Sequence, residues 1–128
     1  MNKREFVLDT LLPYKEDLST RAFDGGSCLY LTADGNKCAV GKHMVEGPWQ
    51  KKITSIKGLV EHYTFEQMLT PEAFAMGFNL NTWAAIQRYH DNLFNNLNSI
   101  QIFELNLVVI GIEDELGIKL PELILKEI

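Results

Sequence analysis

The chain has 128 residues, 46% of them hydrophobic and 23% charged, and a formal net charge of −5. This length and apolar content suffice for one domain with its own core and exclude a wholly disordered chain. Proteins that bind the nucleic-acid backbone normally carry a basic surplus, so we expect no direct nucleic-acid binding. No apolar run approaches roughly 18 residues, and the N-terminus lacks the apolar stretch of a signal peptide. The sequence therefore predicts no membrane span and a cytoplasmic location.

The first part of the sequence predicts a helix followed by a β-hairpin. Apolar residues recur at helical spacing over residues 3–21, although Pro13 should kink or split this helix. Asp34-Gly35 then lies between two short runs that contain Tyr, Thr and Val. This arrangement is the strongest local signal for a hairpin, which we place at about residues 28–41.

The second half of the sequence predicts three helices, over about residues 71–77, 82–97 and 100–116. Thr70 can cap the first of them, because threonine is a favoured N-cap and proline follows it. The last segment partly resembles a strand, but its length favours a helix, and Gly117 lies where a C-terminal cap belongs. The predicted class is α+β: a mainly helical single domain over residues 1–128, with one β-hairpin packed on the helices.

Two cysteines, Cys28 and Cys38, lie on the two arms of the predicted hairpin, and their spacing fits no standard zinc pattern. A two-residue turn at Asp34-Gly35 would point the thiols to opposite faces. A four-residue turn with Gly35 in a left-handed bulge would place both on one face, with Cα atoms roughly 7–8 Å apart. Neither register allows an easy disulfide. The thiols are then either small buried hydrophobic groups or functional groups.

His90 lies on the apolar side of the predicted 82–97 helix. One interpretation is a core histidine that donates to a carbonyl or carboxylate. The alternative is that His90 faces the hairpin and bonds a thiol or Tyr30. A contact with a thiol would lower the pKa of that thiol and create a nucleophile. Asp91 points about 100° away on a helix, so we do not expect it to orient His90. The candidate catalytic residues are Cys28, Cys38 and His90; the candidate binding residues are Tyr30, Gln87, His90 and Asp91; no metal site and no cofactor is expected.

Three motifs carry a resemblance to a known family. They are Gly26-Ser27-Cys28-Leu29-Tyr30, the stretch from Asp34 to Gly41 (DGNKCAVG), and the stretch from Ile86 to Asp91 (IQRYHD). Over about residues 24–117 the chain resembles a family of small uncharacterised bacteriophage and prophage proteins. The resemblance implies a phage-type accessory protein without an assigned reaction, and it implies that the three motifs converge in space.

These observations favour a protein-binding module that acts on a host or virion partner, including an inhibitory or anti-defence role. An acidic chain suits basic protein targets through electrostatic complementarity. Two alternatives stay open at this point. One is a small enzyme or metal-dependent protein that uses a Cys/His pair, and the other is a structural component of the virion.

Overall fold

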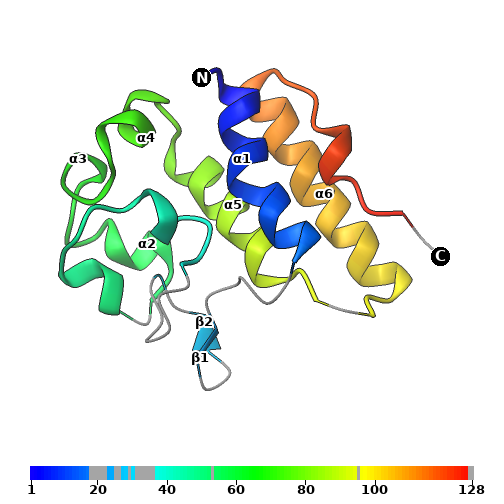
Figure 1. Cartoon of the computed structure of the whole chain (residues 1–128), viewed down its shortest axis with the longest axis horizontal. Helices are drawn as coiled ribbons and strands as arrows, with labels where there is room; N and C mark the ends of the chain where they lie inside the picture. Colours follow the sequence, from blue (N-terminus) through cyan, green and yellow to red (C-terminus); the bar gives the residue numbers. More distant parts are fainter. Residues whose placement is uncertain are drawn as a thin grey trace.

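Three long helices form one side of the protein and lie side by side in the computed structural model (Figure 1). They are α1 (Lys3–Glu16), α5 (Leu80–Asp91) and α6 (Ser99–Leu116). Three short helices, α2 (Ile56–Leu59), α3 (Phe65–Met68) and α4 (Pro71–Ala75), lie on the left of the view, and α2 packs on α5. The structure describes residues 1–17, 23–24, 27–28, 30, 37–52, 54–94 and 96–126.

Side-chain caps set the ends of the long helices. Asn2, Asn79 and Asn98 each accept a hydrogen bond from the backbone N–H three residues later, at the start of α1, α5 and α6. Such caps satisfy amides that have no partner inside the helix. At the other end of α6, Gly117 has φ = 66°, the left-handed conformation that glycine adopts without a steric penalty. α6 therefore occupies the segment for which the sequence predicts a helix.

Two helices differ from their predicted lengths. α1 runs through Pro13 as one helix and ends a turn later at Glu16, so the chain does not split at the proline. Pro13 has no amide to donate to the carbonyl of Asp9, but this lost bond lies in the last turn, so little of the helix depends on it. α5 ends at Asp91 rather than continuing to residue 97, and the side-chain amide of Asn92 bonds to the carbonyl of Arg88 (2.9 Å).

The α+β prediction is wrong, because the described part of the chain is helical. The pairing of β1 (Phe23–Asp24) with β2 (Ser27–Cys28) involves two residues on each side, and no hairpin over 28–41 is formed by the described residues. The predicted Asp34-Gly35 turn lies outside those residues. Gly41 begins the 3₁₀ helix η2 (Gly41–His43) instead of ending a strand.

Side chains explain why residues 38–41 do not form a strand. The amide of Val40 donates to Oε1 of Gln87 (3.1 Å), and that of Gly41 donates to Sγ of Cys38 (3.2 Å). Buried backbone amides need a partner, and here the partners are side chains rather than a neighbouring strand. One backbone bond does join this segment to Tyr30, from the amide of Cys38 to the carbonyl of Tyr30 (3.4 Å).

The core is one apolar cluster that draws on residues from Phe6 to Leu123. Trp83 and Tyr89 of α5 are its largest fully buried side chains. The hydroxyl of Tyr89 donates to the carbonyl of Leu123 (2.9 Å), in the 3₁₀ helix η4 (Pro121–Leu123), and so ties the C-terminal segment to α5. In the ranges that the structure describes, no helix combines the length and the apolar content that crossing a membrane would take.

Candidate functional site

The structure brings together four of the residues that the sequence singles out. Tyr30, Cys38, Gln87 and Asp91 line one hollow of about 430 Å³ between α2, α5 and the segment before η2. His90 is completely buried beside them. The side chain of Cys28 lies outside the described part of the structure. The three motifs therefore meet at α5, although they are far apart in the sequence.

Gln87 holds this cluster together. Its Oε1 accepts from the amide of Val40, and its Nε2 donates to Oδ1 of Asp91 (2.6 Å). Only 9% of Gln87 is exposed, so neither bond competes with bulk water to the extent that a surface bond does. A single amide thus fixes the 38–41 segment on α5 and orients a carboxylate at the edge of the hollow.

The contact between His90 and Asp91 contradicts one expectation. Nδ1 of His90 lies 2.9 Å from Oδ1 of Asp91, so neighbours in the sequence do interact at the end of α5. The same carboxylate oxygen is bonded by Gln87. The ring of His90 also packs edge-on against Tyr14 of α1, with 4.7 Å between centroids. The surroundings of His90 match a buried core histidine beside a carboxylate.

Cys38 is a buried thiol and not an activated nucleophile. Its exposure is 0%, and burial raises its pKa to about 12. Hydrogen bonds from Gly41, Val40 and Gln87 act in the opposite direction but do not outweigh the loss of hydration. Reactive cysteines have a lowered pKa and access to solvent, and Cys38 has neither. In the described ranges, no three His, Cys, Asp or Glu side chains lie close enough to hold a metal ion.

Gly41 is needed because the chain approaches Tyr30. A Cβ at Gly41 would lie 2.0 Å from the carbonyl oxygen of Tyr30, which no side chain can tolerate. The hydroxyl of Tyr30 donates to the carbonyl of Thr54 (2.7 Å), so Tyr30 links this segment to the start of α2. The close approach at Gly41 is therefore to the backbone of Tyr30.

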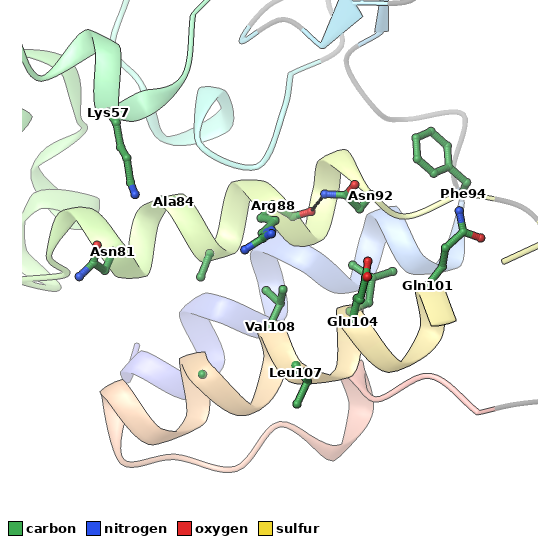
Figure 2. A pocket seen from close by; sticks show the side chains of 13 residues that line it. Lys57, Asn81, Ala84, Arg88, Asn92, Phe94, Gln101, Glu104, Leu107 and Val108 are labelled. Carbon is green, nitrogen blue, oxygen red and sulfur yellow. Dashed lines mark hydrogen bonds between the residues drawn. The ribbon is translucent and has the colours of Figure 1, made fainter. Parts of the chain in front are cut away.

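A second depression, which the sequence did not indicate, continues the first one across α5. This groove has a volume of about 750 Å³ and runs between α5 and α6 (Figure 2). It shares Lys57, Ala84, Arg88 and Asn92 with the hollow at Cys38. The two depressions therefore form one continuous concave surface from α2 over α5 to α6. Concave surfaces of this kind are the default places for a ligand or a partner segment.

The walls of the groove carry charged groups without ion-pair partners among the described residues. Lys57 reaches from α2 toward α5, and Arg88 lies between α5 and α6 (Figure 2). Glu104 lies on the α6 wall, and neither it nor the two cations belongs to an ion pair in the part of the chain described. The rest of the wall includes the apolar side chains of Leu107 and Val108. The groove thus offers both charged and apolar contacts.

Gly111 lines the α6 wall, and the fold itself does not require a glycine there. Apart from its own stretch of helix, a Cβ at this position would meet no atom of the described residues within 4 Å, and the backbone is helical. Glycine inside a helix costs about 1 kcal/mol relative to alanine. The glycine therefore lowers the stability of α6, and the packing of the described residues gives no reason for it.

The chain matches no protein-family model, and comparisons with curated proteins and with solved structures give no match either. The resemblance to phage proteins stays a prediction, and the functional argument rests on the geometry of the described surface.

Proposed function

We propose that this chain is a phage- or prophage-type accessory protein that binds a segment of a host or virion protein in the groove between α5 and α6. Gly111 carries the proposal, because its missing side chain lets an incoming chain approach α6 closely. The motif resemblance supports the phage-type assignment and the host cytoplasm as its location.

The lining of the groove indicates the chemistry of the segment. Apolar side chains would pack on Val108, and a carboxylate would pair with Lys57 and Arg88. Charge-assisted hydrogen bonds from such cations are stronger than neutral ones. The partner as a whole would be basic, because the net charge of −5 steers basic proteins toward this chain.

The burial of Cys38 argues against an enzyme that uses this thiol as its nucleophile. A nucleophile needs a thiolate that substrate can reach. Cys38 is fully buried and its pKa is raised, so it supplies neither a thiolate nor access.

A photo-crosslinking amino acid in place of Asn81, at the end of the groove, tests the proposal in bacterial cells that express the chain. We expect one cellular protein to become crosslinked, and we expect Gly111→Gln to abolish that crosslink. Glutamine fills the groove but favours a helix by several tenths of a kcal/mol over glycine, so the loss would not reflect unfolding.

The matched control places the same photo-reactive group at Glu66 on α3, away from the groove. Crosslinks that are the same from both positions, or that persist in Gly111→Gln, would contradict a partner site in the groove. So would the absence of any crosslink from Asn81 to another protein.

A further inference from the structure

α6 has a second apolar face that does not pack on the core formed by the described residues. Four large side chains, Ile100, Phe103, Leu107 and Ile110, are 69%, 63%, 49% and 43% exposed. We call them the α6 stripe. Single exposed hydrophobic residues are common, but four in one row on one helix mark an interaction surface.

The stripe lies opposite the side of α6 that faces the core. Successive residues of an α-helix are about 100° apart, which puts the stripe on the side away from the buried Leu105, Val109 and Ile112. A helix that is apolar on all sides is normally buried on all sides. α6 is apolar on two opposite sides, and its own fold covers one of them.

We propose that the stripe binds the stripe of a second copy of this chain, with the two α6 helices antiparallel. The steps between the four stripe residues are three, four and three. This spacing reads the same in both directions, so a two-fold axis midway between Phe103 and Leu107 places Ile100 opposite the second copy's Ile110. Alternating steps of three and four are also the pattern by which two helices pack along a seam.

The charges of α6 select the antiparallel arrangement. The helix carries Glu104, a cluster at Glu113, Asp114 and Glu115, and no Lys or Arg. A parallel pair would place the two acidic clusters side by side. An antiparallel pair places each cluster next to the first turn of the other α6, which holds no acidic residue and has the positive end of the helix dipole.

The mass of the protein in solution tests this proposal. Light scattering should give twice 14.6 kDa for the wild type and 14.6 kDa for Phe103→Glu at the same concentration. The glutamate would be buried against apolar side chains, which should weaken association at least about tenfold. Phe103 does not line the groove, so the loss of the dimer would leave the proposed partner site intact.

Phe74→Glu is the matched control, because Phe74 is 46% exposed on α4, away from the stripe. This variant should remain dimeric. A monomeric wild type over the accessible range of concentration would overturn the proposal, and so would a dimer that Phe103→Glu leaves unchanged. Equal disruption by Phe74→Glu would also overturn it.

Disulfide trapping checks the orientation in a Cys28→Ser background. A mixture of Phe103→Cys and Leu107→Cys chains should form mainly the mixed disulfide, because residue 103 faces residue 107 in the antiparallel pair. If disulfides instead form mainly between two Phe103→Cys chains or between two Leu107→Cys chains, the helices are parallel and the antiparallel arrangement is wrong. The dependence on salt distinguishes a second copy from another partner. Added salt should strengthen the association of two acidic chains, because it screens their repulsion. If the stripe instead binds a basic helix, and salt weakens that binding, the proposal of a second copy is wrong.

Discussion

Replacing Gln87 by leucine tests how the candidate site is held together. Gln87→Leu keeps a side chain of similar size on α5 but removes both polar atoms. The amide of Val40 then loses its acceptor at 3.1 Å, and Asp91 loses its donor at 2.6 Å.

The expected cost follows from the burial of these groups. Val40 is 0% exposed, so its amide cannot turn to water, and an unsatisfied buried amide costs about 1–3 kcal/mol. The side chain of Asp91 is 34% exposed and regains water in place of the lost bond. The apolar surface of leucine offsets part of the loss. We expect a net decrease of about 2 kcal/mol in the free energy of unfolding, out of roughly 5–15 kcal/mol for a domain.

Chemical denaturation monitored by circular dichroism measures this change. A decrease of 2 kcal/mol corresponds to a fall of about 8 °C in the melting temperature for a chain of this length. Asp91→Asn is the control, because it keeps an oxygen that accepts from Gln87 and leaves the Val40 bond in place. It should cost less than about 1 kcal/mol. If Gln87→Leu unfolds within about 0.5 kcal/mol of the wild type, Gln87 does not hold the 38–41 segment on α5.

Three further predictions concern α6, His43 and Cys38. Gly111→Ala should raise the free energy of unfolding by about 1 kcal/mol in denaturation, because the space is open and the backbone helical. Gly117→Ala should lower the free energy of unfolding by about 1–2 kcal/mol, since alanine is strained at φ = 66°. If both glycine variants changed the free energy of unfolding in the same direction, this explanation would be wrong. Burial, and then the charge of Lys42, lower the pKa of His43 to about 4 from 6.5. The unfolded chain therefore binds the proton first as the pH falls, and stability present above pH 6.5 is lost by about 3 kcal/mol toward pH 4. Denaturation against pH should show this slope, and His43→Gln should remove it. In a Cys28→Ser background, the thiol of Cys38 should react with a thiol reagent only after unfolding, and rapid reaction of the native protein would contradict its burial.

Local signals decided several features of the chain. Thr70 before Pro71 places the start of α4, and Gly117 ends α6, because capping and left-handed backbone depend on a few adjacent residues.

Tertiary contacts decided the rest. The hairpin signal around residues 28–41 was overruled because Gln87, 47 residues from Val40, takes the amide that a strand would have used. The sequence pointed to Tyr30, Cys38, Gln87 and Asp91, but their common hollow depends on how the 38–41 segment and α2 pack against α5.

The α5–α6 groove and the exposed α6 stripe were not visible in the sequence for the same physical reason. Apolar residues occur on opposite sides of α6, and only the packing of α5 determines which side is covered. By itself the sequence determined where α6 begins and ends and that it is apolar. The tertiary structure decided that one of its apolar faces is left at the surface, where packing against a second chain would bury it.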